Sequence, residues 1–153
     1  MNFAIVGATG NVGRKTIEIL EKSKLKINNI FLVASRKSVG KKVSFKRKKI
    51  KIIALENYDF SKADITFFAA GSAIAKKWAP IAAKQTIVID NSQHFRMDKN
   101  ISLVVPEVNE SALKNYKKTN IIASPNCSTT QLVVALKPLH DEFKIKRIVV
   151  STY

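Results

Sequence analysis

The chain has 153 residues, of which 46% are hydrophobic and 25% are charged, a composition ordinary for one globular domain of typical size. No apolar run approaches the roughly 18 residues that a membrane span needs, so we expect no membrane association. The N-terminus lacks the basic region and cleavage site of a secretory signal, and the single cysteine excludes an internal disulfide. Both observations favour a reducing, cytoplasmic location.

The net charge is +16, from 27 Lys and Arg against 11 Asp and Glu. Such an excess can indicate a nucleic-acid partner, but nucleic-acid sites favour arginine and interleaved aromatic side chains, and here the excess is mostly lysine. Between Glu21 and Glu56 there is no acidic residue, and basic residues crowd at positions 41–42 and 46–49. We interpret this block as a solvated hairpin and expect no nucleic-acid partner. A polyanion-binding domain that uses residues 36–51 is the alternative.

The N-terminal third has the pattern of a dinucleotide-binding unit. Residues 2–6 and 30–34 are apolar runs that predict buried parallel strands, and residues 14–22 predict a helix between them. The first strand and the helix are joined by a turn with the spacing Gly-x-x-Gly-x-x-Gly. Glycines allow close backbone approach, and a helix N-terminus offers N–H groups to a pyrophosphate. We therefore expect a nucleotide cofactor to contact Gly7, Ala8, Thr9, Gly10, Asn11, Val12 and Gly13.

The same helix should pack one side against the sheet. Apolar positions at three-to-four spacing predict which side that is. We expect the inward face to carry Val12, Thr16, Ile19 and Leu20.

The loop after the second strand indicates which nucleotide binds. An NAD-dependent enzyme places Asp or Glu there to bind the ribose 2′-hydroxyl. This loop reads Ser35-Arg36-Lys37-Ser38, with no acid in reach. Arg36 can donate two parallel hydrogen bonds to a phosphate dianion, and Ser35 and Ser38 can each donate one. We therefore predict NADP(H) rather than NAD, with a generic basic loop as the alternative.

The remaining pattern indicates an α/β fold with a Rossmann-type, doubly wound and mostly parallel sheet. Residues 42–46 and 50–53 predict a surface hairpin or an edge excursion. A helix is expected over residues 73–84, kinked or divided at Pro80. Further strands are predicted over residues 64–69, 86–90, 103–105 and 120–123.

The only cysteine, Cys127, lies between a polar turn and a predicted helix that extends to Glu142. The first turn of a helix favours the thiolate, which is how cysteine becomes a nucleophile at neutral pH. A small buried hydrophobe is the alternative. In a doubly wound sheet, ligands bind beyond the carboxyl ends of the strands. The residues expected to share that edge, with the thiol facing the nicotinamide, are Gly7, Ser35, Gly71, Asn91 and Cys127.

Longer segments resemble one known family. They cover residues 7–13, 35–38, 68–72, 88–92, 95–98, 103–109, 125–129 and 137–140. Together they resemble the N-terminal portion of the aspartate-β-semialdehyde dehydrogenases. The sister family, N-acetyl-γ-glutamyl-phosphate reductase, typically has Gly before the cysteine and Tyr-Pro after it, whereas Asn126 and Ser128 occupy these places here. That reductase remains an alternative.

The resemblance implies NADPH-dependent reduction of β-aspartyl phosphate to aspartate semialdehyde, in the biosynthesis of lysine, threonine and methionine. Cys127 would attack the substrate and form a thioester, while Asn126 would hold the oxyanion or orient the thiol. Arg96 would bind the expelled phosphate, against the alternative of a surface ion pair with Asp98. No metal is implied. Beyond the first turn and Ser35, Arg36 and Ser38, the implied cofactor residues are Ala70, Gly71, Ser72 and Asn91.

The resemblance also divides the chain. Residues 1–125 would form the NADP-binding domain, and residues 126–153 would begin a catalytic and dimerisation domain, including a strand over residues 147–151. The family's acid–base histidine, its arginine for the substrate carboxylate and most of its dimer interface belong to the rest of that domain. A homodimer or larger assembly, and a complementary C-terminal half, are therefore the expected partners. A non-catalytic NADP-binding module is the alternative function.

Neither histidine is expected to replace the missing base. His140 is 13 residues beyond Cys127 on the same predicted helix, roughly 20 Å along its axis. His94 lies in the loop of Arg96 and is interpreted as an ordinary polar loop residue.

Overall fold

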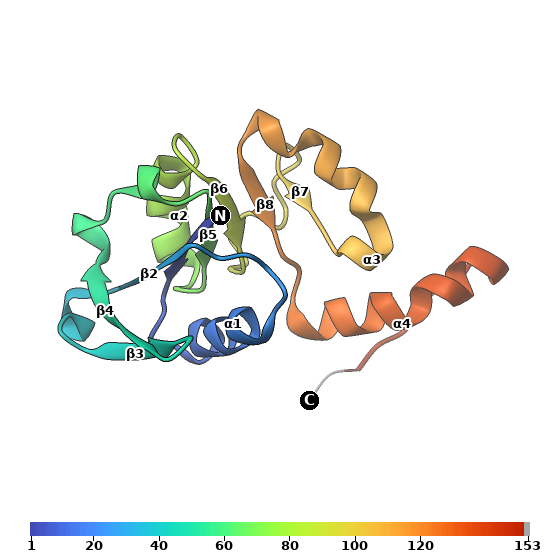
Figure 1. The fold of residues 1–153 in the computed structure, drawn as a ribbon. Helices are drawn as coiled ribbons and strands as arrows, with labels where there is room; N and C mark the ends of the chain where they lie inside the picture. The colour runs from blue at the N-terminus through green and yellow to red at the C-terminus, as the bar shows by residue number, and fades with distance from the viewer. Residues whose placement is uncertain (152–153) are drawn as a thin grey trace.

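The computed structural model describes residues 1–151, which form one eight-stranded sheet flanked by helices (Figure 1). The strand order is β3-β4-β2-β1-β5-β6-β8-β7, and all neighbours are parallel except the antiparallel pair β3 and β4. The strands are β1 Asn2–Val6, β2 Asn29–Ala34, β3 Lys42–Phe45, β4 Lys48–Ala54, β5 Ile65–Phe68, β6 Ile87–Asp90, β7 Ser102–Leu103 and β8 Ile121–Ala123. This topology confirms the predicted doubly wound, mostly parallel α/β fold.

Helices cover both faces of the sheet. The α-helices are α1 Asn11–Lys22, α2 Ser72–Ala82, α3 Pro106–Asn109 and α4 Cys127–Phe143. Short 3₁₀ segments occur at Arg36–Ser38, Leu55–Asn57, Phe60–Lys62 and Glu110–Lys118. Helix α2 continues through Pro80 to Ala82, so the helix is not divided at the proline. Every helix within residues 1–151 is too short or too polar to span a bilayer.

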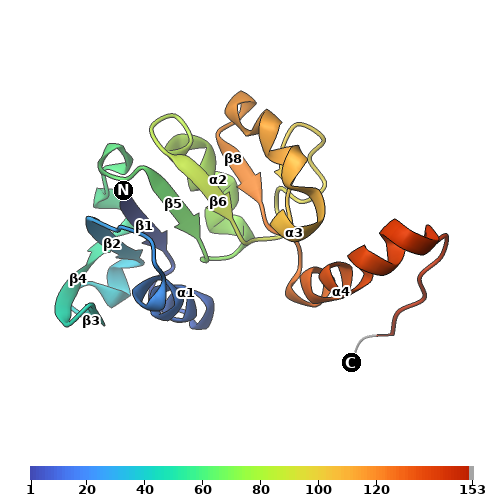
Figure 2. The same ribbon diagram turned by 45° about the vertical axis from the view of Figure 1, so that its right-hand side comes forward.

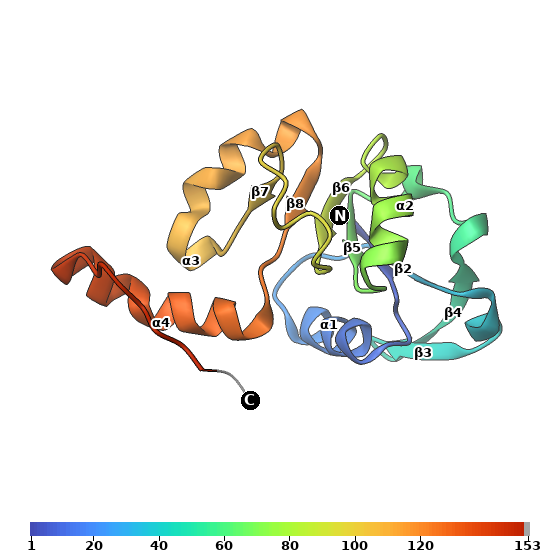
Figure 3. The same ribbon diagram turned by 180° about the vertical axis from the view of Figure 1, so that it is seen from behind.

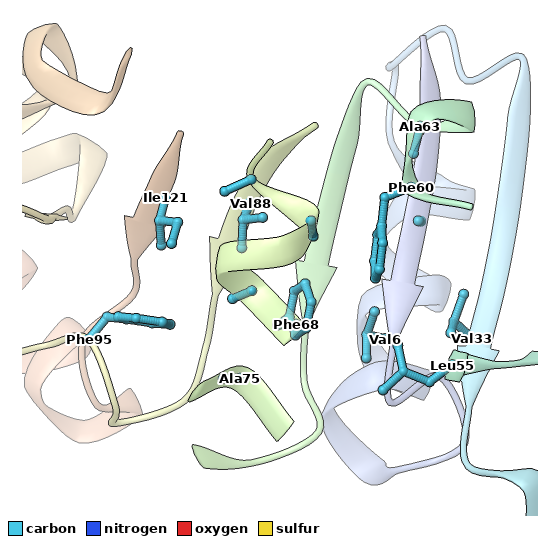
Figure 4. Close-up of a cluster of buried hydrophobic side chains, with 14 of the residues drawn as sticks. Val6, Val33, Leu55, Phe60, Ala63, Phe68, Ala75, Val88, Phe95 and Ile121 are labelled. Carbon is cyan, nitrogen blue, oxygen red and sulfur yellow. The ribbon is translucent and has the colours of Figure 1, made fainter. Parts of the chain in front are cut away.

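Two apolar clusters form the core, one on each face of the sheet. Alternate residues of β1 point to opposite faces, as the pleat of a strand requires. Phe3 and Ile5 pack with Ile17 of α1 in one cluster. Val6 joins Phe68, Val88 and the alanines of α2 in the other, which Figure 4 shows. The small side chains of α2 let this helix lie close to the sheet.

The inward face of α1 differs from the prediction. Its buried residues are Gly13, Ile17 and Leu20, of which only Leu20 was predicted. Thr16 is half-buried, and Val12 and Ile19 are 46% and 58% exposed. The cause is the contact of the helix with the glycine turn. A Cβ atom at Gly13 would lie 2.2 Å from the carbonyl oxygen of Gly7, so only glycine allows this approach. Gly13, Ile17 and Leu20 are four and three residues apart, so the contact and a regular helical repeat select the same face.

The β3–β4 segment is part of the main sheet, and the predicted surface hairpin is only its outer edge. Residues Lys46 and Arg47 form the tight turn, with φ of 45° and 66°. Strand β4 then runs parallel to β2, with Leu32 opposite Ile52 and Ala34 opposite Ala54. The end of β4 therefore lies beside the end of β2.

The C-terminal segment is the least buried part of the chain. Helix α4 contains no buried residue and extends away from the sheet (Figure 3). The predicted strand over residues 147–151 is wrong, because these residues have no regular structure. Ile148, Val149 and Val150 are 52%, 80% and 53% exposed. A β-strand needs a partner for its backbone groups, and this segment pairs with no strand within the described residues.

We predict that Gly13→Ala destabilises the fold by about 2–3 kcal/mol or more, because the new methyl group would overlap the Gly7 carbonyl. The matched control is Gly10→Ala, where the Cβ atom would lie 3.4 Å from the same oxygen and φ is −75°. That control should change the free energy of unfolding by less than about 1 kcal/mol. Urea denaturation followed by circular dichroism measures both, and equal losses in the two variants would contradict the prediction.

Candidate active site

The carboxyl ends of β2, β1, β5, β6 and β8, which are neighbours in the sheet, lie at one edge (Figure 2). Their registers pair Val6 with Val33 and Phe68, Phe68 with Asp90, and Asp90 with Ala123. The residues that directly follow these strands are thus level with one another. From β2 to β8 there are four strand spacings, roughly 19 Å at about 4.8 Å each. An elongated ligand could lie across this edge.

The glycine turn leaves backbone donors for a ligand. The N–H groups of Gly7 and Ala8 both donate to the carbonyl of Val33 on β2, at 2.8 and 3.1 Å. Gly7 adopts φ of +89°, which glycine reaches without strain. The first backbone bond of α1 runs from the N–H of Arg14 to Gly10 at 2.9 Å, so the helix does not use the N–H groups of the residues before Arg14. Asn11 and Val12 are exposed, and their N–H groups lie where helices bind anions.

A pocket of about 360 Å³ lies against this turn. The predicted cofactor residues that line it are Gly7, Thr9, Gly10, Ser35 and Ala70. Further lining residues that sequence reasoning missed are Leu55, Glu56, Ile74 and Trp78. The pocket is thus polar along the turn and apolar on the side of α2. Such a mixed lining suits a nucleotide, which has both charged and aromatic parts.

The predicted 2′-phosphate loop is only partly available. Ser35 and Arg36 are exposed. Ser38 is buried, and its hydroxyl lies 3.3 Å from that of Thr9, so this hydroxyl holds the loop against the glycine turn. The expectation that no acid is in reach is wrong, because Glu56 Oε2 lies 3.8 Å from Arg36 Nε. The acid comes from the end of β4, which pairs in parallel with β2 and so ends at the same edge.

Cys127 is the first residue of α4 and is exposed, so it is not the small buried hydrophobe of the alternative interpretation. Asn126 caps the helix, and its Oδ1 accepts hydrogen bonds from Ser128 N at 2.9 Å and from Ser128 Oγ at 2.7 Å. The thiol of Cys127 also donates to this oxygen, at 3.8 Å. The asparagine is therefore fixed by the helix N-terminus, and its amide oxygen orients the thiol.

Arg96 connects two strand ends. Its Nε donates to the carbonyl of Ser124 at 2.9 Å, and its Nη2 donates to that of Asn91 at 3.2 Å. The alternative ion pair with Asp98 does not form within the described residues, and Asp98 accepts from the N–H of Asn100 instead. Because Ser124 lies three residues before Cys127, the guanidinium is held in the segment that leads to the thiol.

A buried carboxylate, Asp90, organises the loop that carries Arg96. Asp90 is fully buried at the end of β6 and accepts hydrogen bonds from the N–H and hydroxyl groups of Ser92, at 3.2 and 2.6 Å. Its backbone carbonyl accepts from the N–H of Ser124 at 2.8 Å. Burial raises the pKa of Asp90, although the bonds from Ser92 and the charge of Arg96 oppose this shift. Asp90 thus ties together the loops after β6 and β8.

The two histidines are both exposed. The ring of His94 packs edge-on against Phe95, with 4.6 Å between the ring centroids. His140 lies in the last turn of α4, at the opposite end from Cys127. Within residues 1–151 no group of three or more His, Cys, Asp or Glu side chains is placed to hold a metal ion.

A comparison with protein-family models identifies the family of this chain. Residues 2–116 match the family model described as semialdehyde dehydrogenase, NAD binding domain. The chain belongs to the semialdehyde dehydrogenase family. This membership confirms the resemblance and is consistent with the pocket beside the glycine turn as a nucleotide site.

Several relatives in this family are named aspartate-semialdehyde dehydrogenase. The one from Rickettsia bellii is 51% identical over 153 residues, which is 99% of this chain and 45% of the relative. The crystal structure of aspartate semialdehyde dehydrogenase II from Vibrio cholerae, complexed with ASA, matches with a TM-score of 0.90 at 47% identity and covers 92% of this chain and 46% of that one. The Candida albicans enzyme with NADP matches with a TM-score of 0.72 at 27% identity, over 93% of this chain and 47% of that one. The chain thus spans about half the length of the relatives that it matches.

Some of the additional residues at this edge of the sheet do have a signal in the sequence. Asp90 ends an apolar run and is followed by Asn91-Ser92. An aspartate in such a turn can accept a hydrogen bond from the backbone N–H of the residue two positions later. Leu55 and Glu56 directly follow the run of β4. Trp78 and Ile74 had no such signal, because their helix is apolar on several sides and only the packing shows which side borders the pocket.

We predict a pH-dependent effect of Asp90→Asn on stability. The raised pKa means that the folded chain binds this proton more tightly than the unfolded chain does, so the contribution of Asp90 to stability falls as pH rises from about 4 towards neutrality. The free energy of unfolding of the parent should therefore decrease over that interval relative to Asp90→Asn. Urea denaturation at a series of pH values measures the difference. A constant difference would contradict the prediction, and Asp98→Asn, which removes an exposed carboxylate from the same loop, is the control.

Proposed function

We propose that this chain carries the cofactor site and the nucleophile of an enzyme that reduces β-aspartyl phosphate to aspartate semialdehyde with NADPH. The single observation that carries the proposal is the exposed thiol of Cys127, capped by Asn126 at a helix N-terminus, on the same sheet edge as the glycine turn. The names of the relatives support the substrate, and the NADP bound by the Candida albicans enzyme supports the cofactor.

The residues present fit a dinucleotide. The N–H groups at the start of α1 that the helix does not use suit the pyrophosphate of the dinucleotide. Gly10 has no side chain to block the ligand, and the space that a Cβ atom would fill there is bordered only by the carbonyl oxygen of Gly7. Arg36 would hold the 2′-phosphate, with Ser35 beside it. The apolar side of the pocket, with Ile74 and Trp78, suits the adenine ring. Gly71, Ser72 and Asn91, which follow β5 and β6, would border the remaining length of the cofactor.

The proposed chemistry begins at Cys127. Its thiolate attacks the acyl carbon of the substrate, the bond from this carbon to the phosphate oxygen breaks, and inorganic phosphate leaves. When bound, NADPH supplies the hydride that reduces the resulting thioester. Collapse of the thiohemiacetal releases the aldehyde and returns the thiolate. The carbon–sulfur bond that forms in the first step is thus broken in the last.

The neighbours of Cys127 have distinct roles in this proposal. The amide oxygen of Asn126 accepts from the thiol and the helix, so the amide nitrogen is left to donate to the oxyanion. Arg96 uses Nε and Nη2 to hold two backbone carbonyls, which leaves Nη1 to bind the departing phosphate. In this proposal residues 1–125 form the cofactor domain, and residues 126–153 begin a second domain. The acid–base group would come from the rest of that second domain. A homodimer or larger assembly would complete the site.

We expect Cys127→Ser to reduce turnover at least about 1,000-fold, because a hydroxyl is a far weaker nucleophile without a strong base. Production of NADPH from aspartate semialdehyde, NADP and phosphate measures turnover, with the chain complemented in trans by the C-terminal half of the Rickettsia bellii relative. Ser128→Ala is the matched control, since Asn126 keeps its bond from Ser128 N. No turnover in any mixture, with NADP binding retained, would instead favour a non-catalytic module.

Binding of NADPH should depend on Arg36. Removal of a charge-assisted pair of hydrogen bonds by Arg36→Ala should weaken NADPH at least about tenfold and leave NADH within about threefold. The only tryptophan of the chain, Trp78, lines the pocket, so its fluorescence reports binding directly. Lys37→Ala removes the adjacent positive charge and is the control. Equal losses for the two nucleotides would contradict the assignment of Arg36 to the 2′-phosphate.

A further inference from the structure

We propose that Glu56 is a second determinant of cofactor choice, which binds the adenosine ribose 2′-hydroxyl of NAD(H) and opposes the 2′-phosphate of NADP(H). The site would therefore bind both nucleotides, and NADP(H) would be favoured less strongly than Arg36 alone would allow. This inference rests on the proposed binding of a dinucleotide in the pocket beside the glycine turn.

The position of Glu56 follows from the strand register. Ala34 at the end of β2 lies opposite Ala54 at the end of β4. The next residues along the two strands, Ser35 and Leu55, leave the sheet at the same level, and both line the pocket together with Glu56. A carboxylate from β4 thus reaches the place beside β2 where a dinucleotide-binding fold receives the ribose.

Glu56 is only weakly paired with Arg36, so its carboxylate is available to contact a ligand. Its Oε2 lies 3.8 Å from Arg36 Nε, beyond the range of a strong hydrogen bond, and the two side chains are 45% and 77% exposed. An ion pair this exposed contributes little and is screened by salt. Either partner can therefore exchange it for a ligand group at low cost.

The two nucleotides would meet this pair in different ways. A 2′-hydroxyl can donate a hydrogen bond to the Glu56 carboxylate, as it does to the acid that NAD-binding folds place after β2. A 2′-phosphate would pair with Arg36 but would bring a dianion beside the Glu56 carboxylate, and like charges repel. Ser38 does not offset the repulsion, because its buried hydroxyl is paired with Thr9. Glu56 therefore strengthens one nucleotide and weakens the other.

The test is titration of NADPH and NADH into the chain and its Glu56→Gln variant, followed by the fluorescence of Trp78. Glutamine keeps the shape but removes the charge, so we expect Kd to fall about threefold or more for NADPH and to rise about threefold or more for NADH. The ratio of the two constants should shift by about tenfold. Glu142→Gln, at an exposed position of α4 outside the pocket, removes the same charge and should leave the ratio unchanged.

The outcomes separate this inference from the function on which it rests. A ratio within twofold of the parent, with both nucleotides still binding, would overturn the role of Glu56 alone. Absence of binding of both nucleotides to the parent would overturn the cofactor site and this inference together. An equal shift in Glu142→Gln would show that net charge, rather than the position of Glu56, controls the preference.

Discussion

The close contact between Gly13 and the carbonyl of Gly7 is the constraint on which the cofactor end of the domain depends. It brings the first turn of α1 directly onto the end of β1, where no side chain fits between them. The bonds from Gly7 and Ala8 to Val33 then lock the same turn to β2. The helix N-terminus is therefore held at the sheet edge with its anion-binding N–H groups, and the burial of Ile17 and Leu20 places the same face of α1 against the sheet.

The other end of the site is held by polar groups instead. Asp90, Ser92 and Arg96 join the loop after β6 to the segment between β8 and α4, and Asn126 continues the connection to the thiol. The bonds involve backbone carbonyls and N–H groups, so they define the path of the chain as well as the side chains. Asp90 forms no ion pair within the described residues, so its buried carboxyl group depends on the two hydrogen bonds from Ser92.

These two ends are separated by the width of four strand spacings, and the parallel registers keep them level. The cofactor loop and the nucleophile are therefore held by different contacts, although one ligand would connect them. Helix α4 begins at Cys127 and extends away from the sheet, so its N-terminus is the part that belongs to the site (Figure 1).

Residue patterns were enough to predict the strands of the sheet, the glycine turn, the start of α4 at Cys127 and the family, because buried parallel strands are apolar runs and turns need particular residues. Three other features depend on contacts between segments that are distant in the chain or on their absence. The inward face of α1 follows the spacing of Gly13, Ile17 and Leu20, and only the contact of Gly13 with Gly7 shows that this glycine belongs to the buried side. The strand predicted after α4 does not form, because apolar composition cannot supply a pairing partner. Glu56 reaches Arg36 because β4 pairs in parallel with β2, and a pairing between strands is a long-range choice that the local pattern of residues 48–54 does not contain.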